Sequence, residues 1–131
     1  VDGFSGKTVA LLGLSFKPNT DDMRFAPSIP IIEALQKEGA AIQAYDPEAM
    51  QRAKKHLKIK LCEGPYDAAN QADALLILTE WNEFKELDLT KIRSIMKKPI
   101  IFDGRNIYNP AEMLKAGFTY ISIGRKPVGD T

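Results

Sequence analysis

Short apolar runs alternate along the chain with stretches whose apolar residues recur at helical spacing. The runs at 8–14 and 73–78 are apolar almost throughout, as is typical of strands covered on both faces. Shorter runs predict further strands at 41–45, 59–62, 100–102 and 120–123. Helices are predicted at 29–38, 47–57, 66–71, 90–97 and from 110 to Gly117, with a loop or turn at 79–84.

Capping residues stand where these helices should begin and end. Ser28 is the predicted N-cap of the helix at 29–38, and Gly39 follows it at the position a helix C-terminus favours. Asp46 precedes a proline and is the predicted N-cap of the next helix. Asn109 and Glu112 have the spacing of a capping box.

Six strands that alternate with helices predict right-handed crossovers and an α/β fold. We expect a doubly wound, Rossmann-like, mainly parallel six-stranded sheet with helices on both faces. Such sheets bind ligands at the carboxyl ends of their strands, near the point where the strand order reverses. The loops of interest are therefore those after Leu14, Tyr45, Leu78 and Phe102.

Two of these loops carry cations that suit an anionic ligand. The loop from Gly13 to Arg24 holds Lys17 and Arg24, but it lacks the G-x-G-x-x-G dinucleotide fingerprint. Arg105 follows the fifth strand through Gly104, whose freedom allows a sharp turn toward the same edge. A solvated first loop is an equally favoured alternative, and Arg105 has a surface salt bridge with Asp103 as its competing explanation.

Other reactive residue types have structural interpretations. Cys62, the only cysteine, is expected to pack as a small hydrophobic residue. His56 lacks a partner at metal-ligand spacing, so we predict no metal site. Trp81 is expected to pack over the end of the sheet rather than to stack on a ligand. Asp46 stands where some dinucleotide-binding folds hold a ribose, but we favour its capping role.

Length, charge and the apolar runs limit the classes of partner that the chain can bind. A length of 131 residues fits one domain, and a net charge of +1 argues against nucleic-acid binding. No apolar run approaches the length of a membrane span and no signal peptide is evident, so we expect a cytoplasmic protein without membrane contact. The abrupt entry into the first strand suggests a piece of a longer polypeptide.

Three ordered motifs carry a resemblance to a known family. The segments at 13–24 and 26–28, then Thr79-Glu80-Trp81, then 102–106, resemble the UDP-binding domain of the UDP-glucose/GDP-mannose dehydrogenase family. The resemblance implies that residues 1–131 form a single UDP-sugar-binding domain of a longer three-domain chain. That parent would oxidise the C6 alcohol of a UDP-sugar to a carboxylate in two hydride transfers to NAD, and would assemble as a homo-oligomer.

The resemblance also assigns roles to individual residues. Phe16, Lys17 and Arg105 would bind the UDP-sugar, and Arg24 would reach toward NAD held by another domain. Phe25 departs from the acidic residue that the family often has there. The family's catalytic cysteine belongs to a segment absent here and Cys62 does not match it, so no catalytic residue is expected and the chain alone should be inactive.

Two other classes of function stay open at this point. One is a free-standing nucleotide- or CoA-binding α/β module without a catalytic parent. The other is a purely structural assembly domain, for which a nucleotide would leave the melting temperature unchanged.

Overall fold

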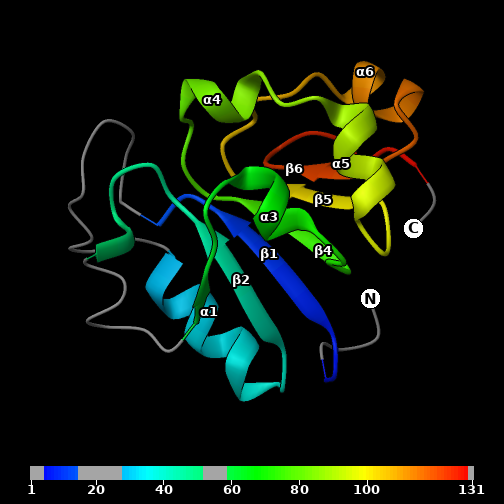
Figure 1. Cartoon of the computed structure of the whole chain (residues 1–131). Coiled ribbons are helices and arrows are strands. Elements are labelled where there is room, and N and C mark those ends of the chain that lie inside the picture. Colours follow the sequence, from blue (N-terminus) through cyan, green and yellow to red (C-terminus); the bar gives the residue numbers. More distant parts are fainter. Residues whose placement is uncertain (1–4, 15–27, 52–58, 130–131) are drawn as a thin grey trace.

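A computed structural model of the chain describes residues 5–14, 28–51 and 59–129, and its centre is one six-stranded sheet (Figure 1). All neighbouring strands are parallel. The strands are β1 (Thr8–Leu12), β2 (Ala41–Tyr45), β3 (Lys60–Leu61), β4 (Ala74–Ile77), β5 (Ile100–Asp103) and β6 (Thr119–Ser122), in the spatial order β3-β2-β1-β4-β5-β6. This order confirms the predicted doubly wound architecture, with its reversal between β1 and β4.

Helices cover both faces of this sheet, as predicted (Figure 1). The described helices are α1 (Ser28–Lys37), α3 (Pro65–Ala69), α4 (Asn82–Lys85), α5 (Leu89–Ile95) and α6 (Pro110–Lys115). Because side chains alternate along a strand, Val9 and Leu11 of β1 pack in one apolar layer with Ile32 of α1. Ala10 and Leu12 face the opposite layer, which contains buried residues of α3, α4, α5 and α6.

Several helix ends follow the predicted capping chemistry. After α1, Gly39 has a φ of +92°, its N–H bonds Gln36 O, and the Ala40 N–H bonds Leu35 O, the pattern of a Schellman motif. The side chain of Asn109 accepts from the amides of Ala111 and Glu112, so the predicted N-cap of α6 is confirmed.

Three predictions need correction. Ser28 is the first residue of α1 rather than its N-cap, and its hydroxyl donates to Leu14 O at 2.7 Å. The segment 79–84 is not only a turn, because α4 begins at Asn82 and buries Phe84. The third strand has two residues instead of four, since it pairs only with the end of β2. The predicted helix at 47–57 extends beyond the described residues.

Candidate functional site

The point of strand reversal requires glycine at residue 13. Gly13 follows β1 with a φ of +99°, and a Cβ atom there would lie 2.5 Å from Thr79 Oγ1 and 2.7 Å from the Thr79 backbone nitrogen. The Gly13 N–H also donates to Tyr45 O at 2.9 Å. The missing side chain therefore lets the ends of β1 and β4 approach each other closely.

Asp46 organises the first half of this sheet edge. Its carboxylate is buried; Oδ2 accepts from the Leu14 amide at 2.7 Å, and Oδ1 accepts from the amides of Glu48 and Ala49 at 2.8 Å each. The predicted capping role is confirmed, and the bond to Leu14 adds a link between β2 and the start of the loop after β1. This carboxylate is held by backbone amides, which supports the structural interpretation.

Asp103 organises the second half in a similar way. It is 1% exposed, and its oxygens accept from the amides of Arg105 at 2.9 Å, Ile107 at 2.8 Å and Tyr108 at 3.2 Å. The Tyr120 hydroxyl donates to the same carboxylate at 2.5 Å. The predicted alternative of a surface salt bridge between Asp103 and the Arg105 side chain is therefore wrong, because Asp103 is buried and bonds the Arg105 backbone.

The Arg105 guanidinium instead pairs with Glu80, which follows β4. Nε lies 2.6 Å from Glu80 Oε2, and Nη2 lies 2.8 Å from Oε1, while the two side chains are 33% and 31% exposed. The hydrogen bonds from Arg105 lower the pKa of Glu80, and the bonds to Glu80 raise the pKa of Arg105. The pair therefore stays ionised on both sides at neutral pH.

Sequence reasoning did not identify Glu80 as the partner of Arg105, because their proximity follows from the register of two strands. Ile77 and Asp103 are register partners on the adjacent strands β4 and β5. Glu80 and Arg105 lie three and two residues beyond those partners, so the topology brings them to one stretch of the sheet edge.

The end of β6 is tied to the same edge. Arg125 Nη2 donates to the Tyr120 hydroxyl at 2.8 Å, and Asn106 exchanges two hydrogen bonds with the backbone of Ile123 at 2.8 and 2.9 Å. Burial, followed by the bond to Asp103, raises the pKa of Tyr120 to about 12. The turn that carries Arg105 is thus fixed to its neighbours on both sides.

The remaining candidates divide into two groups. Phe16, Lys17, Arg24, Phe25 and His56 lie outside the described residues, so the convergence of Lys17 with Arg105 stays a prediction. Trp81 and Cys62, 9% and 2% exposed, belong to the apolar layer as predicted, and burial raises the pKa of the Cys62 thiol. Within the described ranges, the Trp81 indole N–H is buried without a hydrogen-bond partner.

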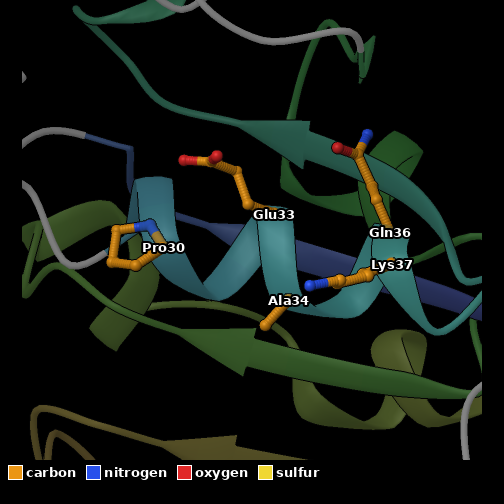
Figure 2. A pocket seen from close by; sticks show the side chains of 5 residues that line it. All are labelled: Pro30, Glu33, Ala34, Gln36 and Lys37. Atoms are coloured by element: carbon orange, nitrogen blue, oxygen red, sulfur yellow. The ribbon is translucent and has the colours of Figure 1, made fainter.

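Two hollows lie away from this edge. One follows the outer side of α1 and is lined by Pro30, Glu33, Ala34, Gln36 and Lys37, whose side chains do not converge on a common point (Figure 2). Another lies at the amino ends of β5 and β6, where Arg93 and Lys98 stand beside the exposed Leu114. Neither is at the edge where doubly wound folds bind ligands.

The described residues form neither a metal site nor a membrane-spanning helix. No three His, Cys, Asp or Glu side chains among them are placed to hold a metal ion. In that part of the chain, no helix has the length and apolar character needed to cross a membrane.

Comparison with known proteins gives a consistent result. Residues 10–110 match the UDP binding domain of the UDP-glucose/GDP-mannose dehydrogenase family. A UDP-glucose 6-dehydrogenase of Rhizobium meliloti is 52% identical over 121 residues, which cover 92% of this chain and 28% of that protein. A UDP-glucose 6-dehydrogenase of Pseudomonas aeruginosa is 44% identical over 133 residues, covering 96% of this chain and 29% of that protein.

Solved structures agree with these sequence matches. A dehydrogenase for NDP-N-acetyl-D-galactosaminuronic acid from Methanosarcina mazei superimposes with a TM-score of 0.82 at 29% identity, over 93% of this chain and 25% of that one. A UDP-glucose dehydrogenase from Pyrobaculum islandicum superimposes with a TM-score of 0.74 at 30% identity, over 93% of this chain and 26% of that one. The chain thus spans under a third of the length of these relatives.

Proposed function

This chain belongs to the UDP-glucose/GDP-mannose dehydrogenase family, and we propose that it supplies the UDP-binding part of an NAD-dependent UDP-glucose 6-dehydrogenase. In this proposal residues 1–131 are one domain of a longer, three-domain polypeptide that forms a homo-oligomer. The parent oxidises the sugar C6 alcohol to a carboxylate, and this chain holds the nucleotide while the reaction proceeds elsewhere.

The observation that carries the proposal is Arg105 at the carboxyl edge of β5. Its backbone is bonded by Asp103 and its guanidinium by Glu80, one strand away from the reversal between β1 and β4. A guanidinium is a planar fork that suits phosphate oxygens, and it lies at the sheet edge where doubly wound folds bind nucleotides, near the reversal. Phe16 and Lys17, from the loop after β1, complete the proposed substrate contacts.

The residues of this chain do not fit a complete NAD site. Gly13 is the only glycine in the loop after β1, so the fingerprint that brings a helix N-terminus to a pyrophosphate is missing. When bound, NAD accepts the hydrides, and we place it in parts of the polypeptide beyond this chain, with Arg24 reaching toward it. We therefore expect the chain alone to bind a UDP-sugar without oxidising the sugar.

The experiment is a titration of the chain with UDP, with Lys17→Ala and Arg105→Ala as the variants. Because part of the cleft is supplied elsewhere, we expect a dissociation constant on the order of millimolar, which is about −4 kcal/mol. Each variant should weaken binding, since each removes a charge-assisted contact. Micromolar UDP binding that survives both substitutions would refute the site.

A further inference from the structure

Arg105 is held at both ends of its side chain before any ligand arrives. Its backbone amide donates to Asp103 Oδ1 at 2.9 Å, and the preceding Gly104 amide donates to Ile77 O at 2.8 Å. At the other end, Glu80 takes hydrogen bonds from Nε and Nη2. A long side chain that would otherwise sample many rotamers therefore favours one orientation.

The geometry of the pair decides which donors remain. A guanidinium has five N–H donors in a fixed plane, and Glu80 takes the edge formed by Nε and one hydrogen of Nη2. The opposite edge, formed by Nη1 and the second hydrogen of Nη2, donates to no residue that the structure describes. This edge can bind two oxygens of one phosphate side by side without displacing Glu80.

Glu80 could act on an anionic ligand in two opposite ways. Its charge repels a phosphate, but the phosphate would bind on the far side of the guanidinium, at a solvent-exposed edge where the high dielectric constant of water weakens the repulsion. Its two hydrogen bonds also order a side chain whose immobilisation otherwise opposes binding. At physiological ionic strength, the ordering should exceed the repulsion.

We propose that Glu80 is a positioning residue: it orients Arg105 so that the Nη1–Nη2 edge of the guanidinium binds a phosphate group of the nucleotide. This inference rests on the proposed function, because it assigns the geometry of the same contact. Glu80 itself does not touch the ligand, and its effect on binding passes through Arg105.

The test is a double-mutant cycle on UDP binding at fixed ionic strength. Glu80→Ala should weaken binding by about three- to tenfold, the range expected when one long side chain must be ordered on binding. Glu80→Gln keeps an acceptor without the charge and should fall between wild type and Glu80→Ala. In the Arg105→Ala background, Glu80→Ala should have no further effect.

Glu83→Ala is the matched control. It removes the same charge three residues along the chain, from a side chain that bonds Tyr45 rather than Arg105. It should leave the affinity within about twofold of wild type, as expected of an exposed charge that does not bond Arg105. A second readout uses the ligand-free protein: the Arg105 Nε–H signal in NMR should exchange slowly with solvent in wild type and quickly in Glu80→Ala.

The outcomes separate the two proposals. If Arg105→Ala weakens UDP binding but Glu80→Ala and Glu80→Gln both strengthen it, Glu80 competes with the ligand and the positioning role is overturned. The role is also overturned if Glu80→Ala has no effect, or the same effect with and without Arg105. If wild type and Arg105→Ala bind UDP equally, or neither binds it, the proposed function fails and the inference fails with it.

Discussion

Asp46 and Asp103 occupy equivalent places in the two halves of the sheet, but they form hydrogen bonds with different parts of the chain. Asp46 directly follows β2 and Asp103 is the last residue of β5; both are buried and accept hydrogen bonds from amides of the chain after them. Asp46 also bonds Leu14, where the loop after β1 begins. Asp103 bonds the amide of Arg105 and the hydroxyl of Tyr120, so it fixes a cation and ties β5 to β6.

The comparison shows that a buried carboxylate at the end of a strand can stabilise two different arrangements. A buried carboxylate at a strand end has enough acceptor capacity to satisfy several amides of a tight turn at once. In the first half this carboxylate joins two strand ends, and in the second it presents a guanidinium at the surface. We therefore expect that removing either aspartate destabilises the fold, but that only the loss of Asp103 misplaces Arg105.

The largest expected effect is that of Asp103→Ala. We expect it to lower the free energy of unfolding by about 3 to 5 kcal/mol, because the buried Tyr108 amide and Tyr120 hydroxyl lose their acceptor. Asp46→Ala should lower it by about 3 kcal/mol for the same reason. Urea denaturation measures both, and only the Asp103 variant should change the Arg105 Nε–H signal in NMR.

Asp88→Ala is the control for these two variants. Asp88 also accepts from a backbone amide, that of Lys91 at 3.2 Å, but the bond is exposed at the start of α5. Loss of this cap should lower the free energy of unfolding by about 1 kcal/mol. Equal losses for the exposed and the buried aspartates would contradict the proposed importance of burial.

The second effect concerns the junction between the two halves. Gly13→Ala should destabilise the chain by about 2 to 3 kcal/mol, because a Cβ atom would overlap Thr79 and the backbone is left-handed. Gly6→Ala is the matched control, since Gly6 has a φ of +73° with no atom within 4 Å of an added Cβ. That variant should lose about 1 kcal/mol from backbone strain alone. Equal losses would mean that the contact with Thr79 is unimportant.

A third prediction concerns alkaline pH. Burial raises the pKa of both Tyr45 and Tyr120 from 10.0 to about 12. A raised pKa means that the folded state retains protons that the unfolded state releases, so stability should be complete below pH 10 and should fall as the pH rises toward 12. Denaturation at several pH values measures this, and Tyr45→Phe should make the fall less steep. If Tyr45 and Tyr120 ionised near pH 10 in the folded protein, this prediction would be wrong.

The smallest effect on stability should come from the Glu80–Arg105 pair. Both side chains are about one-third exposed, so Glu80→Ala should change the free energy of unfolding by less than about 1 kcal/mol. The lowered pKa of Glu80 means that this contribution is present above its ordinary pKa and disappears as the pH falls through the folded value. A larger loss at neutral pH would assign the pair to folding rather than to binding.

Sequence patterns predicted correctly those strands that consist almost wholly of apolar residues. They gave wrong predictions where contacts between distant parts of the chain determine the local structure. The strands β1, β4 and β5 are short apolar runs, which are typical of buried strands. Asn109 followed by Pro110 is typical of the start of a helix, and α6 begins there. The helix α4 was missed because its four residues depend on burying Phe84. Ser28 suits an N-cap locally, but its hydroxyl bonds Leu14, fourteen positions earlier in the chain.

The candidate site was predicted only in part for the same reason. Arg105 stands out in the sequence because Gly104 and a strand precede it, but its partner Glu80 lies 25 positions away and is evident only from the register of β4 and β5. A surface position for Asp103, paired with the Arg105 side chain, was the competing explanation for this sequence. Its burial depends on Tyr120 from β6, a contact that no local pattern indicates.

The most direct measurement is an NMR titration of the chain with UDP that follows every backbone amide. The account predicts that the largest shift changes fall on Gly13, Glu80 and residues 104–106, at the carboxyl edge of the sheet. Changes confined to the amino ends of β5 and β6, around Arg93, Lys98 and Gly117, would place the nucleotide in the opposite hollow and contradict the account.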